Sequence, residues 1–537
     1  MKEKFSLWNI LFIQYLKRDW KKIIIWIVGV GIFAAGFVPA FEEIGMGQGL
    51  SGMYETMQNP AMISMVGPTP VVNASEYTLG AMYANEMLLF CAIIAMIIAS
   101  LHVVSHTRKE EDLGLSEIIR SFQVGRQAST LALAIEIIGI HLLLALFIGG
   151  VMASFHVASI SLEGCFLFGT SIGLAGIIGA MIAFVFAQIM PSSSSTNATV
   201  LSLIGILYLV RGVSDISNPN LSMLNPIGWT YLTFPFTSNN WIPLIYGTIF
   251  CSILILIAFA LEGKRDMGVG YLLEREGRAS AKQSLLSIFG LLFKLNKLTI
   301  IAWLIAFFIL GAAYGSIYGD MQVFLESNDL LIQMFSASNV SLEASFTATI
   351  TMIMIGLTAI LPIAIINKLF SEELHSHLSQ IYATKTSRFK MYLTTIAIAT
   401  IAGVIGILFS VWGLGGAALI ALNGNSPLSM LDFLVAGFNF LPIVLFFSGV
   451  SAFLLGWLPK LQKIVYGYLG YCIAINYFEG ILNLPTWFSK TAIISWIPRM
   501  PIEDFDPMIF IVITTISIAL MFIGYIGYKK RDLLEGA

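Results

Sequence analysis

The sequence predicts an all-α polytopic membrane protein built as two tandem, parallel repeats of six transmembrane helices, with short cytoplasmic coupling helices. The composition is the first reason: 57% of the 537 residues are hydrophobic, 11% are charged, and the mean hydropathy is +0.85. Such a chain needs lipid to cover its surface. The second reason is a set of twelve apolar stretches near the length of about 20 residues that a spanning helix requires. The third is that the charged segments of the first half recur, in the same order, in the second half.

The expected spans follow one another with short polar connections, and the fifth, ninth and eleventh have soft boundaries. In chain order they are 22–41, 83–105, 129–154, 164–189, 198–214, 241–261, 298–318, 347–367, 391–422, 433–457, 464–482 and 508–528. Residues 1–261 form the first repeat, 262–281 a polar cytoplasmic linker, and 282–537 the second repeat. Six spans per repeat, an even number, give both repeats the same orientation, unlike the inverted repeats of many secondary transporters.

The positive charges predict the orientation. With the N-terminus inside, the inner segments carry 26 of the 29 Lys and Arg residues, and only Arg211, Lys490 and Arg499 fall elsewhere. This distribution follows the positive-inside rule and places both termini in the cytoplasm of a bacterial, multi-pass plasma-membrane protein. Residues 1–21 and 280–297 are expected to be amphipathic helices lying flat in the interface before their spans.

Two charged inner segments carry the repeat. In the first, Glu110, Glu111, Glu117 and Arg126 follow the second span; in the second, Glu372, Glu373, Gln380 and Arg388 follow the eighth. Each begins acidic and ends basic, as a helix dipole favours. A plain inner loop would need only the basic part. A short charged helix beneath the bilayer is what a membrane subunit needs to dock a soluble motor, so these eight residues are the predicted docking set. Lys264-Arg265-Asp266 and Lys530-Arg531-Asp532 recur as well.

This order of elements resembles the permeases of ABC-2 type (type V) exporters, and most closely the duplicated tetronasin-type exporters of polyketide antibiotics. The resemblance covers essentially the whole chain through loose motifs. It implies that 107–126 and 370–390 are coupling helices seated on two copies of a cytoplasmic ATP-binding cassette ATPase, and that 215–240 and 483–507 are extracellular re-entrant hairpins. The second copy departs from the first where His375-Ser376-His377 replaces Gly114.

The chain carries no signal of catalytic chemistry. It contains no GxxxxGK[ST] phosphate loop and no inner segment long enough for an ATPase domain, so ATP and Mg are expected on the partner subunit. The four cysteines lie in or beside apolar stretches without zinc spacing. The histidine pairs His102 with His106 and His375 with His377 do not complete a four-ligand site. The predictions are therefore no catalytic residue, no cofactor, no metal and no nucleic-acid partner.

Ionisable residues inside spans are costly and are functional candidates. Glu136 and His141 in the third span either pair between packed helices or contact substrate. Arg211 and Glu479 occupy equivalent positions in the fifth and eleventh spans, and are expected either to pair across the two repeats or to reach the outer headgroups. Trp229 and Trp487 lie in the matching outer hairpins, as gate residues or as interfacial anchors.

The leading prediction is the permease subunit of an ATP-driven exporter that moves a hydrophobic or amphipathic compound, such as an antibiotic, drug, peptide or lipid, out of the cell. An ion-coupled secondary transporter would need several midplane carboxylates, and only Glu136 fits. A membrane-embedded transferase would need an acidic or histidine cluster at one membrane face. The sequence does not identify the substrate.

Overall fold

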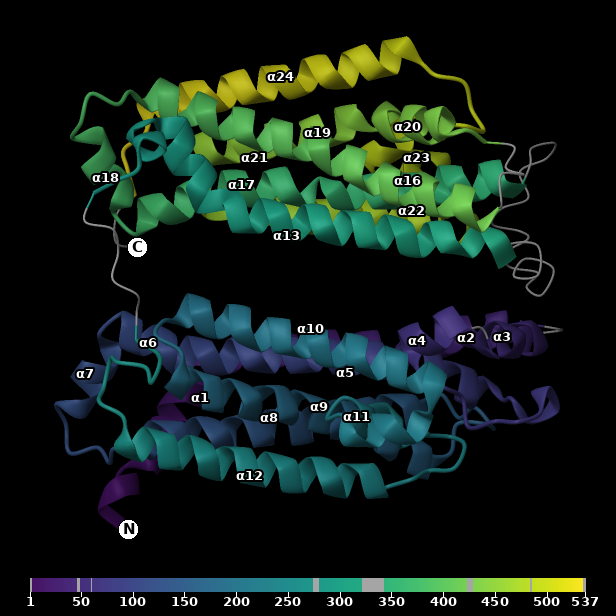
Figure 1. The fold of residues 1–537 in the computed structure, drawn as a ribbon, viewed down its shortest axis with the longest axis vertical. Helices are drawn as coiled ribbons and strands as arrows, with labels where there is room; N and C mark the ends of the chain where they lie inside the picture. The colour runs from purple at the N-terminus through teal and green to yellow at the C-terminus, as the bar shows by residue number, and fades with distance from the viewer. Residues whose placement is uncertain are drawn as a thin grey trace. The chain divides into compact units, whose positions relative to one another are not determined.

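The computed structural model describes residues 2–45, 49–58, 60–273, 280–320, 342–422, 428–482 and 485–534, and every regular element in these ranges is a helix. The chain divides into two compact units, residues 1–276 and 277–537, called unit 1 and unit 2 below (Figure 1). Each unit has its own apolar core.

Unit 1 is a bundle of long helices with short helices at both ends. Its elements are η1 (Lys2–Phe5), α1 (Trp8–Ala35), α2 (Val38–Ile44), α3 (Gly49–Gln58), α4 (Pro60–Val66), η2 (Ala74–Glu76), α5 (Leu79–His106), α6 (Arg108–Asp112), α7 (Leu115–Arg120), α8 (Ala128–Ser154), α9 (Leu162–Ile189), α10 (Ser193–Ser217), η3 (Pro219–Leu224), α11 (Gly228–Tyr231) and α12 (Ile242–Lys264). The short helices α6 and α7 lie at the same end of the unit as the N-terminus, and α2, α3 and α4 lie at the opposite end (Figure 1).

Unit 2 is also a bundle of long helices with short helices at both ends. Its elements are η4 (Gln283–Leu286), α13 (Ile288–Ser316), η5 (Ile317–Asp320), α16 (Leu342–Thr358), α17 (Ile360–Leu374), α18 (His377–Tyr382), α19 (Arg388–Ala421), α20 (Met430–Asn439), α21 (Leu441–Trp457), η6 (Pro459–Leu461), α22 (Ile464–Leu482), α23 (Thr486–Ser489), η7 (Ile493–Trp496) and α24 (Pro507–Lys530). Within this unit α18 lies at the end near the C-terminus, and α20 and α23 lie at the other end (Figure 1).

Glycines let the core helices approach closely. A Cβ on Gly179 of α9 would lie 2.4 Å from the Met96 carbonyl oxygen of α5, and one on Gly169 would lie 2.4 Å from the Ala145 carbonyl oxygen of α8. In unit 2 a Cβ on Gly413 of α19 would lie 2.3 Å from the Phe308 carbonyl oxygen of α13. Real Cβ atoms do not tolerate such distances, so these glycines set the helix spacing, as small residues do in membrane bundles.

Eleven helices of the described residues are long and apolar enough to cross a membrane. The expected eleventh span is the exception: it corresponds to α22, in which the apolar helix Ile464–Asn476 is shorter than the others. The structure therefore agrees with the predicted class of an all-helical, polytopic membrane protein. The count of twelve spans and the tandem repeat stay predictions.

The prediction that residues 1–21 and 280–297 form helices lying flat in the interface before their spans is wrong for both units. The helix α1 runs without a break from Trp8 to Ala35, and α13 runs from Ile288 to Ser316. In α1 the buried side chains continue at helical spacing from the predicted flat segment, with Tyr15 and Asp19, into the predicted span, with Ile23 and Trp26. The first turns therefore pack with the rest of the helix.

Candidate functional site

The charged segments of both units fold into the same turn. In unit 1 the chain leaves α6 at Gly114, which has φ +72°, and its N–H donates to the Glu111 carbonyl over 3.0 Å. In unit 2 Ser376 has φ +59°, and its N–H donates to the Glu373 carbonyl over 2.9 Å. A left-handed residue reverses the chain so that a short helix, α7 or α18, projects from the end of the unit.

A carboxylate in each turn is held by an arginine from the end of the last long helix of its unit. In unit 1 the guanidinium of Arg265, just after α12, contacts both carboxylate oxygens of Glu111, with Nη2 2.5 Å from Oε1 and Nη1 2.9 Å from Oε2. In unit 2 Arg531, just after α24, binds Glu373 in the same two-pronged way, with Nη2 2.6 Å from Oε2 and Nη1 on Oε1. Such bidentate pairs are strong and orientation-specific.

A second arginine completes each of these clamps. Arg126, before α8, donates to the backbone carbonyl of Arg265, and Arg388, the first residue of α19, donates to that of Arg531. The two recurring charged motifs of each half are thus parts of one contact, called the arginine clamp below. It joins the charged turn, the last long helix and the helix that follows the turn.

The clamps differ in their surroundings. In unit 1 Arg108 is 1% exposed, donates to Glu111 Oε2 over 2.7 Å, and reaches the Gly268 and Pro191 carbonyls. Its counterpart in unit 2, counted from the matching turns, is Phe370. There Glu373 instead accepts a bond from the Leu534 N–H over 2.9 Å.

The predicted docking carboxylates are mostly internal. Glu373 is 1% exposed within its clamp, and Glu110 is 5% exposed, held by Arg18 at 2.8 Å. Glu372 contacts Lys368 at 3.0 Å and His377 at 2.6 Å. The other members of the set are exposed to differing degrees: Glu117, Arg126 and Gln380 are exposed, and Glu111 and Arg388 are partly exposed. Four of the acidic residues, Glu110, Glu111, Glu372 and Glu373, contact basic side chains of their own unit, and their role in docking stays a prediction.

The tip formed by α7 and the residues just after it exposes three apolar side chains beside the exposed Glu117. Leu115, Ile118 and Phe122 are 43%, 61% and 67% exposed. Counted from Gly114 and Ser376, the equivalent residues at α18 are His377, Gln380 and Thr384, all exposed. When the two segments are aligned on Gly114 and Ser376, Gln380 is equivalent to Ile118. The sequence alone had paired Gln380 with Glu117, one position earlier. The two units present chemically different tips.

The intramembrane candidates Glu136 and His141 do not pair with each other. Glu136 of α8 lies with Oε2 3.8 Å from Nε2 of His102 on α5. The His141 ring contacts Trp26 edge-on, with 5.2 Å between ring centroids, and lies against Gly176. His141 also lines an apolar groove of about 580 Å³ between α8, α9 and α12.

Arg211 is fully buried within unit 1. Its Nη1 lies 2.8 Å from Oδ2 of Asp215, and its Nη2 donates to the Ser64 and Met65 carbonyls over 2.7 Å each. Asp215 also accepts bonds from the hydroxyls of Ser222 and Tyr231. The side chain of Glu479 lies outside the described residues, so its pairing with Arg211 stays a prediction.

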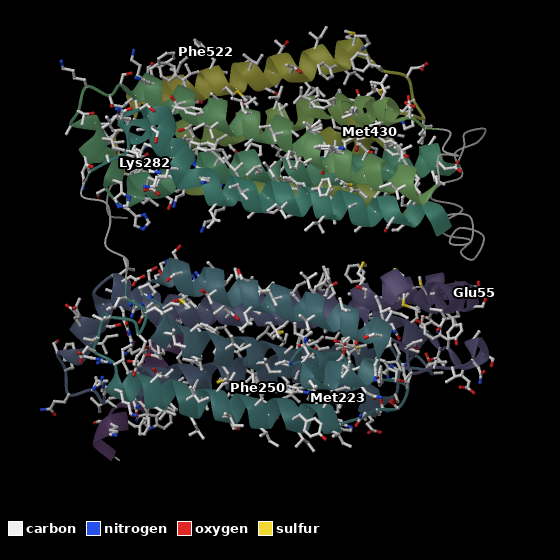
Figure 2. All side chains as sticks on the ribbon, viewed as in Figure 1. Glu55, Met223, Phe250, Lys282, Met430 and Phe522 are labelled. Carbon is white, nitrogen blue, oxygen red and sulfur yellow. The ribbon has the colours of Figure 1, made fainter. Side chains whose placement is uncertain are left out.

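The two hairpin tryptophans have different settings. Trp229 is half-buried, donates from Nε1 to the Met223 carbonyl over 2.6 Å, and packs edge-on against Phe250 with 5.3 Å between centroids; Figure 2 labels Met223 and Phe250. Trp487 is 70% exposed.

Trp229→Ala is expected to cost about 1–3 kcal/mol of unfolding free energy, because it removes a half-buried ring packed against Phe250 and a hydrogen bond. Trp487→Ala is expected to stay within about 0.5 kcal/mol, as exposed substitutions usually do. Thermal unfolding of the purified variants in lipid nanodiscs measures both. Equal losses would show that Trp487 is held by contacts comparable to those of Trp229.

Two sequence comparisons found similar proteins. The family model described as the C-terminal domain of the multidrug efflux system permease Rv1217c matches residues 285–529, which is most of unit 2. The chain is also 25% identical, over 531 residues, to the multidrug efflux system permease protein Rv1217c of Mycobacterium tuberculosis (strain ATCC 25618 / H37Rv), covering 97% of this chain and 94% of that protein. Over nearly its whole length, therefore, this helical membrane chain is similar to a multidrug efflux permease.

Proposed function

We propose that the chain is the transmembrane permease subunit of an ATP-driven exporter that moves a hydrophobic or amphipathic compound out of the cell. Two copies of a cytoplasmic ATP-binding cassette ATPase dock on the projecting turns, one on α6–α7 and one on α17–α18, and supply ATP and Mg. The observation that carries the proposal is the arginine clamp, which both units build from the same residue types at matching positions.

The clamp gives docking a mechanical consequence. In unit 1 a displacement of α7 moves Glu111, and through Arg265 it moves the end of α12. Arg126 connects the same point to the start of α8. Because the bidentate contact fixes both distance and orientation, a partner that pushes on the turn moves two long helices together. Unit 2 has the same linkage through Glu373, Arg531 and Arg388.

The exposed apolar residues of α7 supply the contact area for a partner in unit 1. Large exposed apolar side chains grouped at one tip are typical of interaction sites. The combined variant Ile118→Asp with Phe122→Asp is expected to reduce co-purification of a co-expressed ATP-binding cassette ATPase by at least about tenfold, because it places two charges in the desolvated centre of the contact.

The matched control is Leu273→Asp, an exposed leucine in the segment that follows α12 at the same end of unit 1. Membrane levels of both variants are measured alongside, and the control is expected to co-purify normally. Undiminished co-purification of the α7 variant would show that the ATPase does not dock there.

One observation favours the alternative of an ion-driven transporter, namely the buried carboxyl of Glu136 beside His102. That alternative predicts transport in proteoliposomes driven by an imposed pH gradient without ATP. The proposed exporter predicts no transport until ATP and the ATPase subunit are both present.

A further inference from the structure

Unit 1 contains a row of ionisable side chains that the docking function does not use. They come from three helices packed together: Asp19 from α1, His102 and His106 from α5, and Glu136 from α8. Asp19, Glu136 and His106 are 0%, 1% and 7% exposed. The rings of His102 and His106 touch, with 4.3 Å between their centroids, so the row is continuous.

His106 lies between charged groups of α1 and α6. Its Nδ1 lies 2.8 Å from Nη2 of Arg18, and since a guanidinium is only a donor, Nδ1 accepts this bond. The same nitrogen lies 3.5 Å from Oε1 of Glu110. Nε2 lies 3.0 Å from Oδ2 of Asp19 without making a hydrogen bond. The ring therefore connects Asp19 to the end of the row formed by His102 and Glu136.

Glu136 and His102 form the inner end of the row. Both carboxylate oxygens of Glu136 and Nε2 of His102 have no hydrogen-bond partner among the described residues. An unpaired carboxylate buried at this depth is strongly disfavoured. One proton removes this cost in either of two positions. On the carboxyl it makes Glu136 neutral, and on the imidazole it makes His102 a cationic partner of the carboxylate. We propose that Glu136 and His102 are a proton-binding site that holds one shared proton.

The other charged groups around the row balance one another, so Glu136 and His102 are the groups whose net charge is not balanced. Around the row, α1 contributes Tyr15, Arg18, Asp19 and Lys22, α5 contributes His102 and His106, α6 contributes Glu110, and α8 contributes Glu136 and His141. Arg18 lies within hydrogen-bond distance of Asp19 and Glu110, and Lys22 of Asp19, so two cations balance two anions. The remaining pair reaches neutrality by binding one proton.

The site has a polar access route from the end that carries α6 and α7. A cavity of about 30 Å³ lies against His106 and is lined by Glu110, Glu111, Arg120 and Glu262. That volume is enough for a water molecule. Protons arriving there meet His106 first, then His102, then Glu136.

Unit 2 lacks the site. The buried face of α13 places Asn296 where α1 has Asp19, and the matching turns place Ala364, Lys368 and Ile398 where unit 1 has His102, His106 and Glu136. Only unit 1 can respond to protons in this way. The inference goes beyond the proposed export function, because it requires no partner protein.

Infrared difference spectroscopy of the full-length chain in lipid nanodiscs, between about pH 5 and pH 9, tests the proposal. The wild type is expected to show the carbonyl stretch of a protonated carboxyl whose intensity falls as the pH rises. Glu136→Gln removes this band. His102→Gln is expected to keep the band to a higher pH than in the wild type, because the deprotonated carboxylate then has no imidazole beside it that could carry a proton. His106→Phe slows deuterium exchange of the band at least about tenfold, because the route passes through that ring.

Glu163→Gln is the control, an exposed carboxyl in the first turn of α9 that is not part of the row. It is expected to leave the titrating band unchanged. A wild-type spectrum without a band that Glu136→Gln removes, or a band unaffected by His102→Gln, would overturn the proposal. Since the measurement uses the chain alone, its outcome is independent of ATPase docking.

Discussion

Asp215→Ala is expected to lower the free energy of unfolding of unit 1 by about 3–5 kcal/mol, the cost of leaving one partner of a buried ion pair unpaired. Arg211 and Asp215 are 0% and 2% exposed, and the pair is closed by the Tyr231 hydroxyl. Removing the carboxylate leaves the guanidinium without a charged partner, in contact with the Ser64 and Met65 carbonyls and the rings of Tyr208 and Tyr231. Equilibrium denaturation of the purified chain in detergent micelles measures the loss.

The double variant Arg211→Met with Asp215→Leu is expected to recover most of that loss, since replacing a whole buried pair by apolar side chains is often neutral. Ser217→Ala, at an exposed serine in the last turn of α10, is the control and should stay within about 0.5 kcal/mol. An Asp215→Ala variant as stable as this control would mean that Arg211 is satisfied by another partner. The charge swap Arg211→Glu with Glu479→Arg remains the test of a contact between the two repeats; a swap that transports no better than the worse single variant would exclude it.

Breaking the clamp of unit 2 is expected to have an effect of similar size. Glu373→Lys puts a cation against Arg531 in a place that is 1% exposed, and should cost about 3–5 kcal/mol and abolish transport. Glu111→Lys should act in the same way on Arg265 in unit 1. These substitutions test the fold of the charged turn as well as docking, because both carboxylates are engaged within their own units.

A matched control separates the two effects. Glu117→Lys reverses an exposed charge on α7 and should change stability by no more than about 0.5 kcal/mol. The swap Glu373→Arg with Arg531→Glu should restore part of the stability lost in Glu373→Lys. Limited proteolysis of membranes at the α17–α18 turn reports the local fold, and ATP-dependent export reports coupling. Full export by Glu373→Lys would contradict the mechanical role of the clamp.

Much of the site was predictable in type and place. The recurrence of Glu111 as Glu373, and of Arg265 as Arg531, is visible in the sequence, and both charged segments form turns with short helices. Comparing the two halves of the sequence did not show that Glu111 binds Arg265 or that Glu373 binds Arg531, because the partners are far apart in the chain. The serine at position 376 gave no sign of a left-handed conformation, so the sequence paired Gln380 with Glu117, whereas counting from the two left-handed residues pairs it with Ile118 and keeps Arg388 paired with Arg126.

The sequence by itself determined the class of the protein and the rough positions of its helices, because apolar length and charge distribution are local properties that a bilayer reads directly. Only the tertiary structure decided which charges are internal. Within unit 1, Glu136 lies beside His102, Arg211 binds Asp215, and Glu111 binds Arg265. Ile118 and Phe122 of the charged segment are exposed instead. A buried charge must be neutralised by whatever side chain the packed helices bring beside it, and that depends on helix contacts that no single stretch of sequence encodes.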